Sequence, residues 1–312
     1  MHPPDADEAR RRRARRTAGR TILLSWALCS FLPGCLEAQW VSRPGEGWAD
    51  VSVYHLDTRE AFGFDGRLGD FFAEGHAVST SAFLTLAGGL VPGVDGWIQL
   101  PYHRLRYDDA RADRLRSGIG DTKLFLRVAP LHFLGSELPL AIRGGVKFGV
   151  GDFAVDSEVI PLGDGQTDWE LIGEVGHSFW PAELYVGGWA GYRWREPNEA
   201  AQRDYGDEAF YLAQIGGRLG RIGVQLTVEG MASVTTPVIE GIPLRTAQRS
   251  LHQVMPRLSY AAGPGAWSLG LRVPLRGENL PGGTSLVVGY FTRWSLARGR
   301  RRCLQDGGGA DP

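Results

Sequence analysis

A histidine and a serine that could form a nucleophilic pair lie side by side in the stretch Gly176-His177-Ser178-Phe179. A serine becomes a nucleophile when a nearby histidine takes its proton, so the two side chains must point toward each other. This stretch alternates as a strand does, and adjacent residues of a strand point to opposite faces. We therefore predict no catalytic residue and no enzymatic activity.

Other groups that could bind ligands lack the necessary spacing. His76, His103, His132 and His252 are scattered, which does not suggest a metal site. Acidic residues gather in segments 108–121 and 152–168 without the spacing of a calcium loop, and we expect solvated loop surfaces there. The glycines of segment 216–220 lack the strand–turn–helix context of a nucleotide site. We predict no metal and no cofactor.

The first 38 residues have the features of a secretory signal peptide. Seven arginines lie between positions 10 and 20, an apolar stretch covers 21–33, and Ala38 offers a small residue for cleavage. Cleavage there leaves Cys303 as the single cysteine, which excludes an internal disulfide. Leu32-Pro33-Gly34-Cys35 is an alternative processing site, at which Cys35 would receive lipid.

The rest of the chain alternates between apolar and polar residues with a period of two, as β-strands do. After position 38, no stretch approaches 18 consecutive apolar residues, the length that predicts a membrane helix. Glycine, at 44 of 312 residues, also suits a turn-rich β-structure better than helices. We expect about twelve strands, near 48–57, 74–89, 94–107, 119–130, 138–150, 167–179, 182–195, 207–219, 221–235, 248–261, 265–276 and 284–294.

Three features favour a transmembrane barrel over a soluble sandwich, which alternates in the same way. Many segments are long enough to cross a bilayer, which takes about 9–11 residues when a strand is tilted. Their polar faces carry many charges, and their connections alternate between short and long. We predict an all-β, antiparallel up-and-down barrel over 39–294, with both termini in the periplasm and a disordered tail over 295–312. Pro101, Pro139, Pro256 and Pro274 interrupt these strands, so bulges or strand ends must accommodate them.

The polar faces predict which side chains line the interior of the barrel. Their charges are mainly basic, which favours anionic solutes. The same side chains could instead pair and fill the interior, and at about twelve strands both outcomes stay open. The lumen-lining candidates are Lys123, Arg127, Arg143, Lys147, Glu170, Glu174, Arg193, Arg195, Arg218, Glu229, Arg257 and Arg272.

Several short glycine-based motifs carry a family resemblance. Gln39–Gly47, Phe64-Asp65-Gly66, Ser117–Asp121 and Gly144–Asp152 resemble pieces of a Gram-negative outer-membrane barrel family described as transporters of the phenol-degradation (MetA) pathway. Gly289–Trp294 resembles the aromatic-ended last strand of such barrels. The resemblance covers most of 39–294 and implies transport of aromatic or hydrophobic compounds.

These observations predict a monomeric channel or transporter in the cell outer membrane. Its partners would be outer-membrane lipids, the barrel-assembly machinery and a small-molecule solute. The formal net charge of −1 gives no electrostatic reason to bind nucleic acid. Two alternatives remain: a sealed barrel that acts as an anchor or surface-recognition platform and, less favoured, an outer-membrane lipid hydrolase.

Overall fold

The computed structural model describes residues 41–135, 138–149, 161–179 and 181–296. The predicted signal peptide with Cys35, and the predicted tail beyond Leu296, lie outside the described residues. Both therefore stay predictions. All elements below belong to the unit that spans Ala38–Pro312.

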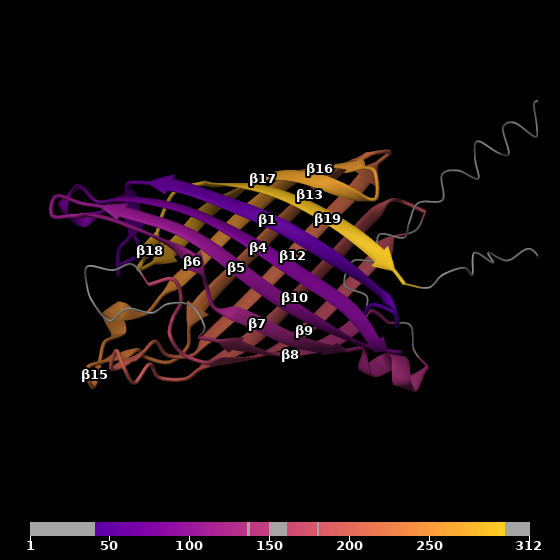
Figure 1. Cartoon of the computed structure of the whole chain (residues 1–312), viewed down its shortest axis with the longest axis horizontal. Coiled ribbons are helices and arrows are strands. Elements are labelled where there is room, and N and C mark those ends of the chain that lie inside the picture. Colours follow the sequence, from indigo (N-terminus) through magenta and orange to yellow (C-terminus); the bar gives the residue numbers. More distant parts are fainter. Residues whose placement is uncertain (1–40, 136–137, 150–160, 180, 297–312) are drawn as a thin grey trace, which may run out of the picture. The chain divides into compact units, whose positions relative to one another are not determined.

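Thirteen strands form one antiparallel sheet that closes on itself (Figure 1). Each strand pairs with its neighbour along the chain, and β1 closes the sheet by pairing with both β19 and β4. β6 and β7 both pair with β5 and share one position, which leaves twelve positions around the barrel. The strands are β1 (Glu46–Thr58), β4 (His76–Val91), β5 (Val94–Asp108), β6 (Asp113–Ile119), β7 (Thr122–Val128), β8 (Leu140–Phe148), β9 (Asp168–Phe179), β10 (Leu184–Arg195), β12 (Glu208–Leu219), β13 (Ile222–Ser233), β16 (Ser250–Ala262), β17 (Gly265–Glu278) and β19 (Ser285–Ser295).

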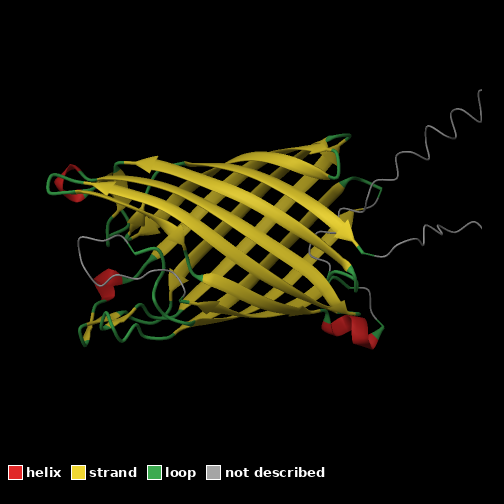
Figure 2. Ribbon diagram, viewed as in Figure 1, coloured by secondary structure: helices red, strands yellow, loops and turns green. Residues whose placement is uncertain are grey.

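The two ends of the barrel differ. At one end, which we call the short-turn end, the connections are mostly tight turns, and β1 begins and β19 ends there (Figure 2). At the other, the long-loop end, the connections carry two small sheets (Figure 1). One sheet consists of β2 (Glu60–Phe62), β3 (Leu68–Asp70) and β18 (Leu280–Pro281), and the other of β11 (Arg203–Asp204), β14 (Val238–Ile239) and β15 (Ile242–Pro243). Short 3-10 helices are η1 (Phe72–Glu74), η2 (Pro130–Leu134) and η3 (Arg245–Ala247).

The barrel is polar inside and apolar outside. Among the described residues, seven hydrophobic side chains are buried, against eighteen polar or charged ones. Along β13, Val224, Leu226 and Val228 are exposed while Thr227 is 1% exposed. This inversion suits a hydrocarbon surrounding, in which a closed sheet also satisfies every backbone amide. No helix in the described part of the chain is long and apolar enough to cross a membrane.

The predicted strands are present, with one informative difference at the fourth. It was expected to begin near residue 119, but it begins at Asp113 and is interrupted after Ile119. Pro101 of β5 cannot donate a hydrogen bond to the neighbouring strand. Its carbonyl accepts one from Gly120, so the interruption lies where the proline faces that strand.

The other prolines are accommodated in similar ways. Pro139 precedes β8, so it lies outside that strand. Pro274 pairs with Gln253 beside a register shift between β16 and β17. Pro256 pairs with Leu226 of β13, and no partner on β17 is assigned to it. These irregularities are the bulges and strand ends that the prolines require.

The seam at which β19 meets β1 depends on a glycine. A methyl group added to Gly47 would lie 2.2 Å from the Trp294 ring and 2.3 Å from the Ala87 carbonyl oxygen. Trp294 lies on the outer face of the last strand and is 40% exposed. The indole therefore packs directly on the backbone of β1 at the closure point.

We predict that Gly47→Ala destabilises the folded barrel by roughly 1–3 kcal/mol, the usual cost of overpacking. Gly144→Ala is the matched control, because a methyl group there would meet nothing within 4 Å. The measurement is the folded fraction from heat-modifiable gel mobility during urea unfolding. Equal stability of the two variants would show that the seam does not depend on this close contact.

Candidate functional site

Two neighbouring sets of ion pairs, which we together call the charge ladder, run along the inside of one wall. Its side chains come from β5, β7, β8, β9, β10 and β12 and from the connections next to them. Seven cations face seven carboxylates, so the ladder is balanced in charge. The cations are Lys123, Arg127, Arg143, Lys147, Arg193, Arg195 and Arg249, and the anions are Asp95, Asp121, Asp164, Asp168, Glu170, Glu174 and Glu208.

Toward the short-turn end, the ladder is formed by two arginines and two carboxylates. Arg127 lies 2.6 Å from Asp95 and 3.2 Å from Glu174, and Arg143 lies 2.8 Å from Glu174. The Asp95 carboxylate is fully buried and also accepts hydrogen bonds from Trp97 and the Ser42 backbone. Charges buried this deeply are tolerated because they are paired.

In the middle of the ladder, Glu170 joins two cations. Its Oε1 accepts from Lys123 at 3.0 Å and from Arg193 at 2.9 Å. Arg193 continues the network to Glu208 at 2.6 Å. Cross-strand registers put Arg193 opposite both carboxylates, which explains why these three side chains meet.

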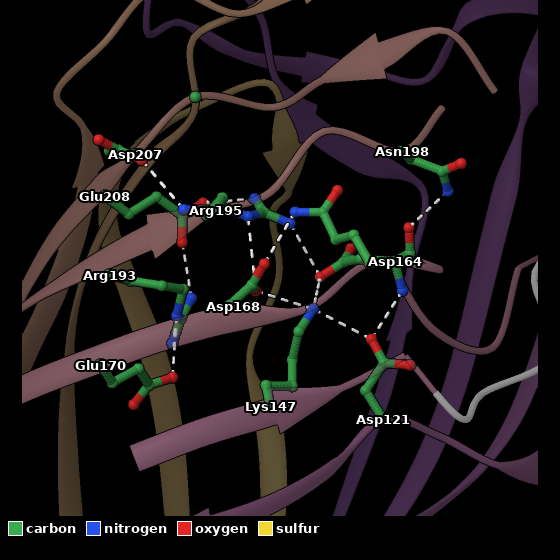
Figure 3. A network of polar contacts seen from close by, with 12 residues as sticks. Asp121, Lys147, Asp164, Asp168, Glu170, Arg193, Arg195, Asn198, Asp207 and Glu208 are labelled. Carbon is green, nitrogen blue, oxygen red and sulfur yellow. Dashed lines mark hydrogen bonds and ion pairs between the residues drawn. The ribbon is translucent and has the colours of Figure 1, made fainter. Parts of the chain in front are cut away.

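Toward the long-loop end, Lys147 and Arg195 gather three carboxylates (Figure 3). Lys147 lies 2.5 Å from Asp164 and 2.9 Å from Asp168, and Arg195 lies 2.9 Å from Asp164. We had expected Asp164 and Asp168 to belong to a solvated loop surface, and for these two residues that prediction is wrong. Asp168 is fully buried and Asp164 reaches inward, because the basic side chains of β8 and β10 need counter-charges.

The connection between β8 and β9 is thus bound to the barrel interior through Asp164. Burial alone would raise the pKa of Asp164, but attraction by Lys147 and Arg195 outweighs it and lowers the pKa to about 2. A depressed pKa stabilises the folded state above the ordinary value of 3.8, and this contribution disappears as the pH falls through the folded value. The relevant window is therefore from about pH 4 down to about pH 2.

We predict that Asp164→Asn flattens the pH dependence of stability in that window. Urea unfolding of the wild type and the variant between pH 5 and pH 2 measures the effect. The stability difference between them should be largest at pH 5 and should shrink toward pH 2. A difference that stays constant over this range would mean that Asp164 is not held as an ion pair.

Most of the predicted lumen-lining residues belong to the ladder, and the remaining four lie elsewhere. Glu229 pairs with Arg272 at 2.8 Å, and Arg218 pairs with Glu183 at 3.2 Å near the short-turn end. Arg257 contacts the Met255 sulfur at 3.6 Å but forms no ion pair with any described residue. The basic excess read from the sequence is thus largely offset by carboxylates. Five carboxylates of the ladder were not among the twelve candidates: Asp95, Asp121, Asp164, Asp168 and Glu208.

The opposite wall, formed by β13, β16, β17, β19, β1 and β4, has a different character. We call its uncharged side chains Ser52, Thr85, Gln225, Thr227 and Gln253 the polar wall. Gln225 donates to Gln214 and Thr227 at 2.9 Å each, and Thr85 accepts from Gln99. This side of the lumen therefore offers neutral hydrogen-bonding groups in place of an ionic network.

Three aromatic rings lie inside the barrel near the short-turn end, and we call them the aromatic corner. Trp48 meets Trp97 edge-to-face at 4.8 Å between ring centroids, and Phe291 lies 5.9 Å from Trp48. Each of the three is only half-buried. Arg127 and Arg143 lie over Trp97 at 4.7 and 4.5 Å, so this ring joins the corner to the ladder. Aromatic residues of membrane barrels favour the lipid interfaces, but the inward face of β1 carries Trp48.

Potential catalytic and metal-binding groups are arranged as follows. His177 points outward and packs on Phe179 at 4.7 Å, consistent with opposite faces for His177 and Ser178. A different pair, Ser81 and His103, is in contact at 2.8 Å across β4 and β5. No pattern in the sequence predicts that pair, because the contact depends on strand register. No cluster that could hold a metal ion occurs within the described ranges.

Comparison with known proteins supports the architecture. No protein-family model matches the chain, and no curated protein matches its sequence. An outer membrane channel from Pseudomonas putida F1 is similar in structure, with a TM-score of 0.67 and 16% identity over 84% of this chain and 99% of that one. The chain has the fold of an outer-membrane β-barrel. Together with the apolar exterior, this places the protein in an outer membrane.

A second solved structure is less similar. The translocator domain of the autotransporter NalP from Neisseria meningitidis gives a TM-score of 0.47 and 13% identity, over 89% of this chain and 98% of that one. The likeness to the P. putida channel, at 16% identity, describes a shared fold and no more. The function of the barrel must therefore be argued from its own interior.

Proposed function

We propose that this protein is a passive channel for small hydrophobic or aromatic solutes, similar in role to the phenol-degradation transporters that its motifs resemble. The observation that carries the proposal is the aromatic corner. Trp48, Trp97 and Phe291 face the interior and stay partly exposed there, whereas rings on a barrel exterior would face lipid. Half-exposed rings inside a barrel offer a surface on which flat apolar solutes can lie.

The charges of the interior also support this solute class. The two indications from the sequence disagreed, because a basic lumen favours anions and the family resemblance favours apolar compounds. A ladder of seven cations and seven anions has no net charge to select small ions strongly. The P. putida protein with the same fold is itself a channel, which agrees with the proposal.

A sealed barrel is the second candidate, and the charge ladder favours it. Arg127, Arg143, Glu174 and Asp168 are at most 7% exposed, so these side chains fill their part of the interior. A barrel sealed by such a network would act as an anchor or as a platform for its long loops. The two candidates differ in whether a path remains beside the polar wall.

Ion conductance of the reconstituted barrel in planar bilayers distinguishes these candidates. We expect measurable conductance, and we expect benzyl alcohol to interrupt the current more than cyclohexylmethanol of similar size, because only the former can stack on the corner. A folded barrel with no conductance would favour the sealed alternative. Equal interruption by both alcohols would contradict an aromatic preference.

We further propose that the barrel works as a monomer and that the barrel-assembly machinery inserts it into the membrane. The last strand supports the second point, because Phe291 and Trp294 lie in the final residues of β19 and Trp294 packs at the seam. Crosslinking of the reconstituted protein tests the first point. A dominant dimer band would contradict it.

A further inference from the structure

We propose that the aromatic corner and Arg257 together form a binding site for aromatic acids, in which the solute ring lies on Trp48 and Phe291 and its carboxylate pairs with the Arg257 guanidinium. This inference rests on the proposed channel function and specifies its solute class. It combines two observations that are independent of each other: exposed rings inside the barrel and a cation that forms no ion pair with any described residue.

Arg257 differs from the cations of the ladder. Its Nε atom is buried and has no hydrogen-bond partner among the described residues, and the guanidinium makes only a weak contact there, through Nη2 to the Met255 sulfur. Each ladder cation instead has at least one carboxylate within 3.2 Å. A guanidinium with unused donors is suited to bind a carboxylate, which can accept two parallel hydrogen bonds.

Asp50 connects Arg257 to the aromatic corner. It lies on β1 two residues from Trp48, and therefore on the same inward face, and its register partner on β19 is Phe291. Asp50 also interacts electrostatically with Arg257 on β16. β19 and β17 separate β1 from β16 in the sheet, and all four strands belong to the same wall of the barrel. The guanidinium and the rings thus share one region of the interior.

The groups next to Arg257 keep the affinity for the solute low enough for a channel. Asp50 partly offsets the charge of Arg257 without forming an ion pair with it. Gln225, the register partner of Arg257, is held by Tyr185, Gln214 and Thr227 and provides a neutral surface. A solute in transit must bind well enough to enter and loosely enough to leave. A guanidinium partly compensated by Asp50 meets that requirement.

The test is equilibrium binding of small fluorinated probes to the detergent-folded full barrel, followed by fluorine NMR. The probes are 4-fluorobenzoate, 4-fluorobenzyl alcohol and 4-fluorobenzylamine, which share a ring and differ in charge. We expect benzoate to bind the wild type most tightly. Arg257→Gln should weaken benzoate binding about tenfold, the effect of losing one charged contact, and should leave the alcohol unchanged. Trp48→Leu should weaken the binding of both 4-fluorobenzoate and 4-fluorobenzyl alcohol.

Arg218→Gln is the matched control, because Arg218 is a basic residue paired with Glu183 near the same end. It should leave all three affinities unchanged, and gel mobility confirms that each variant is folded. Tighter binding of the amine than of benzoate, equal effects of Arg257→Gln and Arg218→Gln, or no benzoate binding would overturn the proposal. Conductance with alcohol binding but no benzoate preference would refute this site alone, whereas a barrel that neither conducts nor binds any probe would refute the channel function as well.

Discussion

Glu174→Gln is expected to destabilise the folded barrel by about 3–5 kcal/mol, the cost of removing one partner from a buried ion pair. Glu174 is 2% exposed and lies between Arg127 and Arg143. Arg127 keeps Asp95 as a partner, but Glu174 provides the ion pair that the structure shows for Arg143. The variant therefore leaves a buried guanidinium without a counter-charge, which is more costly than the pair itself was favourable.

Urea unfolding of the barrel in lipid vesicles measures this effect. Glu183→Gln is the control, because Glu183 is paired with Arg218 but is 30% exposed, and an exposed pair contributes about 0–1 kcal/mol. A loss for Glu174→Gln no larger than that for Glu183→Gln would show that the interior is wet enough to screen the ladder. The ladder would then not be the element that fixes this wall.

Leu226→Arg is expected to destabilise the barrel in the membrane by about 2–4 kcal/mol, the cost of an arginine facing lipid at mid-bilayer depth. Leu226 lies near the middle of β13 and is 45% exposed. The next residue, Thr227, points inward and is 1% exposed. The long arginine side chain cannot turn inward past the strand without breaking the alternation. It must remain in hydrocarbon or distort the bilayer around it.

Leu219→Arg provides the comparison at a different depth. Leu219 ends β12 at the short-turn end and is 87% exposed, so its substituent reaches the interface, where the expected cost is about 0–1 kcal/mol. The free energy of unfolding of both variants in lipid vesicles measures this difference in cost. Equal costs at the two positions would argue against a lipid-facing exterior for β13.

The alternation of apolar and polar residues predicted the strands because each strand has one face in lipid and one in the lumen. The prediction for β13 differs from the structure by two residues at most, since both period and length were clear. The start of β6 was missed because Asp113–Ile119 carries two arginines among small and apolar residues and resembles a loop. The interruption at Gly120 was not foreseen because it depends on the carbonyl of Pro101 in another strand.

The interior was less predictable than the strands. Basic residues such as Arg143 and Lys147 follow from the polar faces, but their partners do not, because pairing depends on register and on loops that reach inward. Asp164 illustrates this point: its segment has loop composition, yet its carboxylate ends 2.5 Å from Lys147. The inward position of Trp48 was equally hard to foresee, because aromatic residues of membrane barrels favour the lipid interfaces.

Our central claim is that solutes pass through the lumen beside the polar wall of a barrel with an apolar exterior. Single-channel conductance of two cysteine variants, in a mature Cys303→Ser background, tests it most directly. Gln225→Cys faces the lumen and Val224→Cys faces lipid, on adjacent residues of β13. We expect a bulky water-soluble thiol reagent to reduce the current through Gln225→Cys and to leave Val224→Cys unchanged. A barrel that conducts no current, or equal responses from the two variants, would contradict the claim.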